Sequence, residues 1–428
     1  MADLFDTPPS VPLYRPIPVL EVVDDPPVVI LDALPAAKAD APLEVLPADA
    51  PPSRNPLVRA LAFAWRCVQA AGSMLEWLFG VVVLMVGLAV LAALPVLQFL
   101  SLGYLLESSG RVARTRRLRD GFIGVRLAAR LGGIVLGSWL MLLPVRLVAD
   151  LAYSAQIIDP GGRRAAGWRI GLFVLIGLTA LHIGMACARG GRLRYFFWPF
   201  NFIWVLLRLL RGGYYAEARD AVWDTTMSLR LPYYFSLGFR GFIGALAWLA
   251  LPVTLLALGR LGTPGAALLG FLGALLLGLV LLYLPFLQTR LARVNRLSAI
   301  FDLPATRAEF RRAPWAFALS FVVTLMFALP LYLLKIEMVP REAAWLPSLV
   351  FIAFIFPARL LTGWALGRAV HRKTPRHWFF RWTGRLAFLP AASFYVTIVF
   401  FTQYTSWNGV WSLYEQHAFL VPVPFFGM

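Results

Sequence analysis

The sequence is poor in charged residues, which make up only 14% of its 428 residues. A soluble protein carries about 25% charged and about 45–50% hydrophobic residues, whereas 60% of this chain is hydrophobic. One water-soluble core cannot bury so much apolar surface. The composition therefore excludes an ordinary soluble globular domain, and we expect the lipid bilayer to cover much of the protein.

Cysteine and histidine are also scarce, with two and four residues, respectively. Cys67 and Cys187 lie far apart and match no spacing of a zinc site, a redox motif or a disulfide framework. Glycine-rich nucleotide-binding loops, the nucleophile elbow and the HExxH metal motif are missing. We therefore expect no metal and no cofactor, and we predict that the chain is not an enzyme.

Lysine is nearly absent, because residues 38, 335 and 373 are the only three and 37 of the 40 basic residues are arginine. With abundant Ala, Gly, Leu and Pro, this bias indicates a GC-rich bacterial genome. The net charge of +18 could indicate nucleic-acid binding. The arginines, however, stand in short loops beside apolar runs, as the positive-inside rule of membrane proteins predicts. We expect no nucleic-acid partner.

Residues 1–56 differ in character from the rest of the chain. They hold 13 of the 31 prolines, and residues 1–50 contain nine acids against two bases. Proline removes backbone donors and fixes φ, so we predict a disordered, acidic, Pro-rich tail. Its short apolar pieces, such as residues 28–31, could bind a protein partner in an extended form. The alternative is a solvated tail.

Long apolar runs fill the remainder. A helix needs about 20 apolar residues to cross the hydrocarbon core, and the alternating pattern of a membrane barrel is absent. We predict an all-α fold, a polytopic transmembrane helical bundle over residues 57–403. Its expected spans lie near residues 76–98, 130–151, 168–188, 236–259, 265–288, 315–334, 345–367 and 386–403.

The first apolar run extends over residues 75–106, which is about 48 Å as a helix and too long for one crossing. Pro95 interrupts it. Either one span is followed by an interfacial helix, or a hairpin breaks at Pro95 and brings the total to nine spans. The arginines at positions 54, 59 and 66, just before the run, favour the hairpin.

The loop charges predict the orientation, because basic loops stay in the cytoplasm. Four segments are rich in arginine and alternate with loops poorer in positive charge; they lie near residues 111–130, 189–194, 290–312 and 368–385. Residues 404–428 contain no lysine or arginine. We predict a multi-pass protein of the bacterial cytoplasmic (inner) membrane, whose aromatic C-terminal tail, residues 404–428, is extracytoplasmic.

Two stretches of the sequence are similar to each other. Residues 94–98 (Leu-Pro-Val-Leu-Gln) and 284–288 (Leu-Pro-Phe-Leu-Gln) each precede an arginine-bearing segment. These segments end in Arg-Val-Ala-Arg (111–114) and Arg-Leu-Ala-Arg (290–293). Duplicated halves are common in transporters. Chance similarity between leucine-rich sequences is the alternative.

Residues 94–106 form a proline-broken apolar segment with a Gly-Tyr-Leu core, and a basic exit follows at Arg111, Arg114 and residues 119–122. In this pattern the chain resembles an uncharacterised family of prokaryotic multi-pass membrane proteins. The resemblance implies a membrane protein. It implies no catalytic residues, so it leaves the function open.

Ionisable side chains inside spans are costly and are therefore the first candidates for a functional site. Arg146 and Asp150 stand four residues apart on one helix face, and His182 and Arg359 lie within other spans. We take these four as candidate substrate-binding residues. The structural alternatives are an ion pair, a hydrogen bond between helices and an inward-facing arginine.

Interfacial helices are predicted near residues 195–228, where an aromatic run beside a basic loop precedes an amphipathic stretch. Glu217, Asp220 and Asp224 fall on one face of that stretch. Three carboxylates could bind a cation. Pairing with the many arginines is the alternative.

Three functions stay open at this point. The acidic tail, the basic loops and the few intramembrane charges favour a non-catalytic membrane scaffold or assembly component. Proline-interrupted spans and the similar stretches are typical of a secondary transporter or permease for a small solute, anionic if Arg359 binds it. A lipid-modifying enzyme, using His182 or the carboxylates of the amphipathic stretch, comes third.

Overall fold

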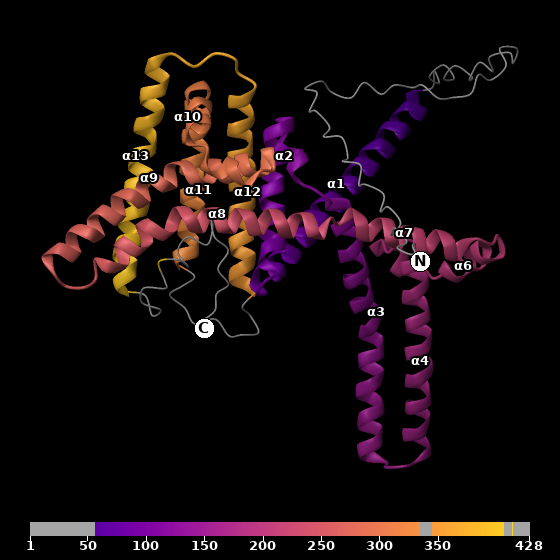
Figure 1. Cartoon of the computed structure of the whole chain (residues 1–428). Coiled ribbons are helices and arrows are strands. Elements are labelled where there is room, and N and C mark those ends of the chain that lie inside the picture. Colours follow the sequence, from indigo (N-terminus) through magenta and orange to yellow (C-terminus); the bar gives the residue numbers. More distant parts are fainter. Residues whose placement is uncertain (1–55, 334–344, 406–412, 414–428) are drawn as a thin grey trace, which may run out of the picture. The chain divides into compact units, whose positions relative to one another are not determined.

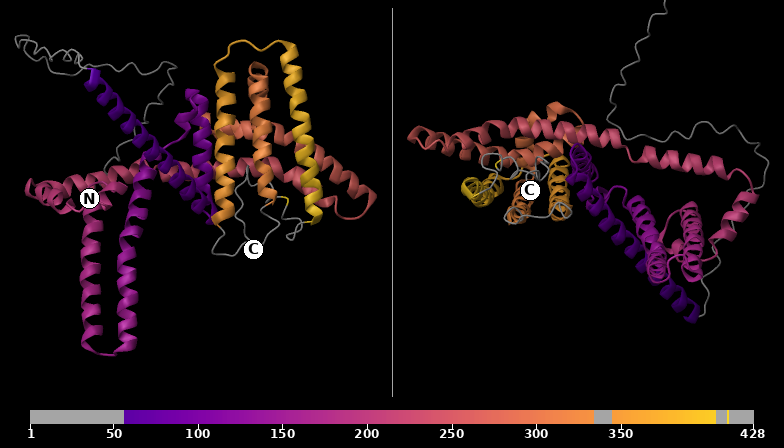
Figure 2. Two further views of the ribbon diagram at one scale, coloured as in Figure 1. Left: turned by 180° about the vertical axis from the view of Figure 1, so that it is seen from behind. Right: turned by 90° about the horizontal axis from the view of Figure 1, so that it is seen from below.

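The computed structural model describes residues 56–333, 345–405 and 413 (Figures 1 and 2). Within these ranges the chain is helical and contains no strand, which confirms the all-α prediction. Almost all of the predicted N-terminal tail and most of the C-terminal tail lie outside the described residues. The chain divides into two units, Met1–Trp65 and Arg66–Met428, and the following concerns the second.

The helices fall into a short and a long class. The short ones, two of them 3₁₀ helices (η), are η1 (Leu118–Gly121), α5 (Leu193–Phe196), α6 (Asn201–Leu210), α7 (Tyr214–Ser228), η2 (Leu297–Phe301) and α10 (Leu303–Arg312). The long ones are α1 (Pro56–Ala93), α2 (Gln98–Thr115), α3 (Val125–Ile158), α4 (Arg163–Ala188), α8 (Leu231–Leu258), α9 (Pro264–Val294), α11 (Pro314–Leu333), α12 (Trp345–Val370) and α13 (Trp378–Thr405).

Within the described residues, seven helical stretches are long and apolar enough to cross a membrane, judged by length and composition. They are Phe63–Ala93, Val125–Ile158, Arg163–Ala188, Tyr214–Leu258, Pro264–Val294, Leu346–Val370 and Trp378–Phe401. These stretches match seven of the eight predicted spans. The remaining one corresponds to α11, whose apolar part over Pro314–Ala328 is shorter. The chain is therefore a polytopic helical membrane protein.

The first apolar run breaks at Pro95, as predicted. α1 ends at Ala93 and α2 begins at Gln98, with Val96 in the left-handed region (φ 67°) between them. Most residues of α2 are buried, so this helix packs inside the protein. α2 is not among the candidate spans of the described residues, so whether it crosses the membrane as the second arm of a hairpin stays a prediction.

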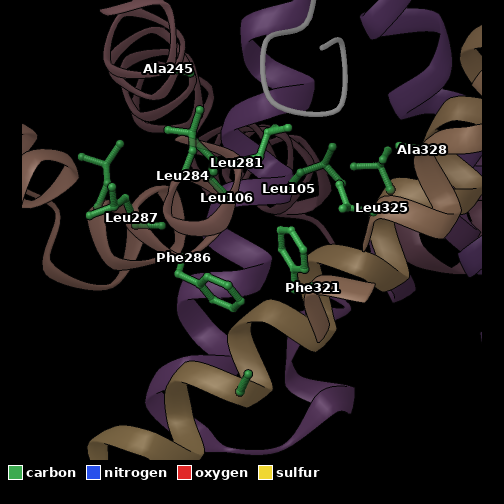
Figure 3. Packing of buried hydrophobic residues seen from close by; sticks show 14 of the residues in the cluster. Leu105, Leu106, Ala245, Leu281, Leu284, Phe286, Leu287, Phe321, Leu325 and Ala328 are labelled. Carbon is green, nitrogen blue, oxygen red and sulfur yellow. The ribbon is translucent and has the colours of Figure 1, made fainter. Parts of the chain in front are cut away.

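The main hydrophobic core is built around α2. This helix packs against α8, α9 and α12, and α11 in turn packs against α12 and α13. Figure 3 shows Leu105 and Leu106 of α2 gathered with Leu284 of α9 and Phe321 of α11. Because lipid is as apolar as these side chains, close packing rather than exclusion of water holds the helices together.

Two glycines allow α2 and α8 to approach each other closely. A Cβ atom at Gly103 would lie 1.8 Å from the carbonyl oxygen of Tyr234, and one at Gly238 would lie 1.9 Å from that of Phe99. Cβ atoms do not come within about 3 Å of other heavy atoms, so no larger residue fits at either position. Small residues at such crossings are typical of membrane helices.

α3 and α4 form a long hairpin, and Figures 1 and 2 show them side by side. Both helices also contact α5, and α4 contacts α6. Large apolar side chains point outward along the hairpin, for example Ile170 and Phe173, which is 68% exposed. Helices that are apolar on all sides are typical of membrane spans.

The arginine-bearing parts of the two similar stretches follow the same backbone course. Arg116 after α2 and Asn295 after α9 both adopt the left-handed conformation, and each backbone N–H donates to the carbonyl four residues earlier. An extended residue and then η1 or η2 follow. The Leu-Pro-x-Leu-Gln parts differ, because Pro95 stands between helices and Pro285 inside α9. The structural similarity is thus limited to the arginine-bearing parts.

Candidate functional site

Charged and polar side chains, including two buried carboxylates, gather where α9 packs against α2 and α10. We term this group the α2–α9 charge cluster; it consists of Glu107, Arg114, Tyr233, Arg290, Arg293, Asp302 and Glu309. Charges inside an apolar protein are costly unless they are paired. The way in which these groups pair therefore decides what the cluster can do.

Glu107 of α2 is buried, with 7% of its surface exposed. One carboxylate oxygen pairs with Arg114, two turns further along α2, and the other accepts a hydrogen bond from the Tyr233 hydroxyl of α8 at 2.7 Å. Arg114 also donates to the Ala292 carbonyl near the end of α9 at 3.2 Å. The last carbonyls of a helix carry partial negative charge, so Arg114 caps α9 while it neutralises Glu107.

Glu309 of α10 is 5% exposed and accepts a hydrogen bond from Arg290 of α9 at 2.5 Å. Arg293, one turn further along α9, lies 3.8 Å from the same carboxylate oxygen. Arg290 also pairs with Asp302 at 2.9 Å, and Asp302 caps α10 by accepting from the backbone N–H of Ala305 at 3.1 Å. These bonds lock the end of α9 to the start of α10.

The electrostatics of Glu309 show that its burial is expensive. Desolvation raises the pKa of this carboxyl, and the positive charges of Arg290 and Arg293 oppose the rise only in part. Desolvation also raises the pKa of the Tyr104 hydroxyl of α2, which donates to the Ile123 carbonyl at 2.9 Å. In both groups burial disfavours the charged form, and hydrogen bonds to neighbouring elements hold the side chain in place.

Among the described residues, no group of three His, Cys, Asp or Glu side chains is placed to hold a metal ion. The cluster itself consists of carboxylates, guanidiniums and one phenol. Its carboxylates are each engaged by arginine. The arginines neutralise the buried carboxylates of Glu107 and Glu309, and the cluster holds α2, α9 and α10 together at their ends.

The four predicted substrate-binding residues lie in different surroundings. Arg146 and Asp150 are both exposed on α3, and no ion pair joins them among the described residues. The His182 Nε2–H of α4 donates to the Phe196 carbonyl at 2.7 Å, which ties α4 to α5. Arg359 is 3% exposed within α12. Their role in binding a substrate stays a prediction.

The structure does not bring these four residues to one site. α12, which carries Arg359, packs against α2, α9, α10 and α11, whereas the hairpin of α3 and α4 packs on itself and on α5 and α6. None of three well-formed cavities in the described part of the chain is lined by Arg146, His182 or Arg359.

The three predicted cation-binding carboxylates all lie exposed on α7. Glu217 pairs with Arg208 of α6, and Asp220 pairs with the adjacent Arg219 at 2.8 Å. Asp224 stands one turn further along the helix. The arginine pairs match the alternative stated for these residues, and the cation site stays a prediction.

Reasoning from sequence missed both buried carboxylates. Glu107 follows directly on the apolar run that ends at Leu106, and it stands seven residues before Arg114, on the same face of a helix. That spacing would have predicted an ion pair between Glu107 and Arg114. The partners of Glu309 lie on another helix, so no local pattern in the sequence predicts this pairing.

Comparisons with family models, with curated proteins and with solved structures found no match to this chain. The function therefore has to be argued from the chemistry of its own residues.

Proposed function

We propose that this chain is a non-catalytic membrane scaffold or assembly component, which binds other membrane proteins and holds them together. The observation that carries the proposal is the pairing of Glu107 and Glu309, the two buried carboxylates of the described residues, with arginines. A catalytic or coupling carboxylate has to be free to exchange a proton or an ion. Here the buried charges serve to hold the helices in place.

Two parts of the chain offer surfaces to partners. The hairpin of α3 and α4 exposes large apolar side chains over much of its length. The acidic, Pro-rich tail, outside the described residues, is the second part, because extended apolar pieces can add to a partner's surface. We propose that partners bind the tail and that the hairpin extends the contact within the bilayer.

Photo-crosslinking tests this proposal. A photoreactive amino acid at the exposed position Phe173 or Leu181 is expected to form a discrete adduct with another membrane protein, identified by mass spectrometry. The same partner should be captured from position 30 in the tail. Ala186, which is fully buried, is the matched control in α4 and should give no adduct between proteins. Labelling of lipid alone from every exposed position would contradict the proposal.

For the membrane and the orientation, we propose the bacterial cytoplasmic membrane with the four arginine-rich segments inside and the C-terminus outside. Contacts between these segments support this orientation. Arg114 donates to the Ala292 carbonyl, and the Arg376 backbone N–H donates to the Arg311 carbonyl at 2.9 Å. Arg130 and Arg192 line one cavity. Segments in contact belong on one side of a membrane, as the positive-inside rule requires.

A transporter is the second candidate, because the arginine-bearing parts of the similar stretches share a backbone course. Single cysteines in a background without Cys67 and Cys187 distinguish the two functions. For a scaffold we expect cysteines at the exposed positions 150 and 220 to react with water-soluble thiol reagents, and those at 182 and 359 to stay unreactive. Reaction at both 182 and 359 would show an aqueous path and would favour the transporter.

A further inference from the structure

A cavity of about 430 Å³ lies between α9, α10, α11 and α13. Its floor is aromatic and deeply buried, since Phe286, Phe317 and Phe388 are at most 6% exposed. The rings of Phe286 and Phe317 are stacked with their centroids 4.3 Å apart. A rigid aromatic floor of this kind accepts an apolar chain and offers it no hydrogen-bond partner.

Three exposed arginines stand at the mouth of this cavity. Arg307 and Arg311 lie one turn apart on α10, and Arg385 comes from α13. The guanidinium of Arg307 lies over the Tyr283 ring, 5.6 Å from its centroid, and that of Arg385 lies over the Trp382 ring at 5.8 Å. Stacking of this kind orients the planar guanidinium and leaves its N–H groups free to meet an oxyanion.

Among the described residues, no acid balances the positive charge at the mouth. No carboxylate lines the cavity, and none of the ion pairs among the described residues includes one of its three arginines. The nearest acid along α10, Glu309, is engaged by Arg290 and Arg293 of α9. Like charges one helical turn apart repel each other, so a bound anion would relieve the repulsion.

We propose that this cavity binds an anionic phospholipid, with the phosphate at Arg307, Arg311 and Arg385 and an acyl chain on the aromatic floor. Charge complementarity selects the anionic headgroup, since guanidinium groups bind phosphate oxygens in pairs. The apolar interior selects a lipid over a soluble anion. α10 connects α9, a membrane span, to the apolar α11, which places the arginines at the edge of the bilayer, where headgroups lie.

The outer wall of the cavity supports an amphiphilic occupant. Leu386 and Leu389 of α13 line the cavity and are more than half exposed. They continue the apolar floor toward the lipid, so a second acyl chain can lie along α13. The site does not depend on the scaffold function proposed above.

Native mass spectrometry of the full chain in detergent micelles tests the site, with phosphatidylglycerol as the anionic probe and phosphatidylcholine as its zwitterionic counterpart. Because each arginine near an anionic headgroup contributes about fivefold in affinity, the triple variant Arg307→Gln/Arg311→Gln/Arg385→Gln should bind phosphatidylglycerol about a hundredfold more weakly. Binding of phosphatidylcholine should not change. The variant Arg163→Gln/Arg164→Gln/Arg169→Gln removes the same charge from exposed positions of α4 and should bind like the wild type.

Three results would overturn the proposal. The first is equal affinity of the triple variant and the wild type for phosphatidylglycerol. The second is displacement of the lipid by millimolar inorganic phosphate, which would show a site for a soluble anion. The third is displacement by a peptide of residues 1–50, which would make the acidic tail the occupant. If the triple variant does not fold, Arg385→Gln alone should weaken binding about fivefold.

Discussion

Alanine at Gly103 is expected to lower the free energy of unfolding by about 3 kcal/mol, the upper end of the usual cost of overpacking. The new methyl group would meet the Tyr234 carbonyl of α8 at 1.8 Å. A carbonyl within a helix cannot rotate away, so α2 and α8 would have to separate, and the packing around Leu105 and Leu237 would loosen. Unfolding by SDS in mixed micelles measures the change.

Gly171 of α4 provides the matched control for this substitution. Among the described residues, no atom beyond its own helical turn lies within 4 Å of its Cβ position, so alanine there creates no overlap. Alanine has the higher helix propensity, and Gly171→Ala should stabilise the protein by up to about 1 kcal/mol. The same chemical change is thus expected to have opposite signs in two helices. Equal effects at Gly103 and Gly171 would contradict the described crossing of α2 and α8.

The two glycines of the crossing should also be energetically coupled. Gly238→Ala would bring a methyl group within 1.9 Å of the Phe99 carbonyl, and it should cost about as much as Gly103→Ala. Once the first methyl group has separated the helices, the second meets less resistance. The double variant should therefore lose less stability than the sum of the two single variants. Strict additivity would place the two glycines at independent contacts.

The spans could be predicted from the sequence because the bilayer imposes their length and composition on each segment separately. The hairpin of α3 and α4 shows this: both helices contain a long apolar stretch, and the predicted spans 130–151 and 168–188 lie within Val125–Ile158 and Arg163–Ala188. The break at Pro95 was also local, since proline cannot continue a helix. These features needed no knowledge of which helix packs against which.

The interior of the protein could not be predicted in this way. Its polar contacts join residues far apart in the sequence, such as Glu107 with Tyr233 and Arg114 with the Ala292 carbonyl. The carboxylate spacing on α7 pointed to a cation, but it says nothing of Arg208, which pairs with Glu217. Which charges meet depends on the crossing of helices, and that crossing is set by glycines whose partners lie on another helix.

Removal of the Glu309 carboxylate is the second change with a large expected effect. Glu309→Ala would leave the partly buried Arg290 and Arg293 near each other, with Asp302 as their only counter-charge among the described residues. Breaking a buried pair by removing one partner costs about 3–5 kcal/mol, because the remaining charge stays desolvated. We expect a loss of about 3 kcal/mol, since Asp302 compensates in part. The same unfolding measurement in SDS checks it.

Glutamine at position 309 should be better tolerated than alanine. Burial raises the pKa of this carboxyl above its usual value, which means that the folded protein favours the neutral form more than the unfolded chain does. Glutamine imitates that neutral form in shape and in hydrogen bonding. We therefore expect Glu309→Gln to cost less stability than Glu309→Ala, because its oxygen still accepts from Arg290, although both variants remove the counter-charge of the two arginines.

The raised pKa of Glu309 also determines whether the protein gains or loses stability as the pH falls. A carboxyl with a raised folded pKa contributes stability that is full below its unfolded pKa and is lost as the pH rises through the folded pKa. As the pH falls from about 7 toward about 4, the wild type should gain stability relative to Glu309→Gln. If the wild type instead lost stability relative to Glu309→Gln as the pH fell, the pKa of the Glu309 carboxyl would be lowered, and its arginines would hold it in the charged form.

Glu217 gives the control for the alanine substitution, because it also pairs with an arginine but is largely exposed. Solvent screens that pair, so Glu217→Ala should cost less than about 1 kcal/mol. If Glu217→Ala and Glu309→Ala were equally destabilising, burial would not be the source of the effect. A loss confined to Glu309 would show that the charge cluster holds α9 and α10 together, and that its carboxylates are committed to structure.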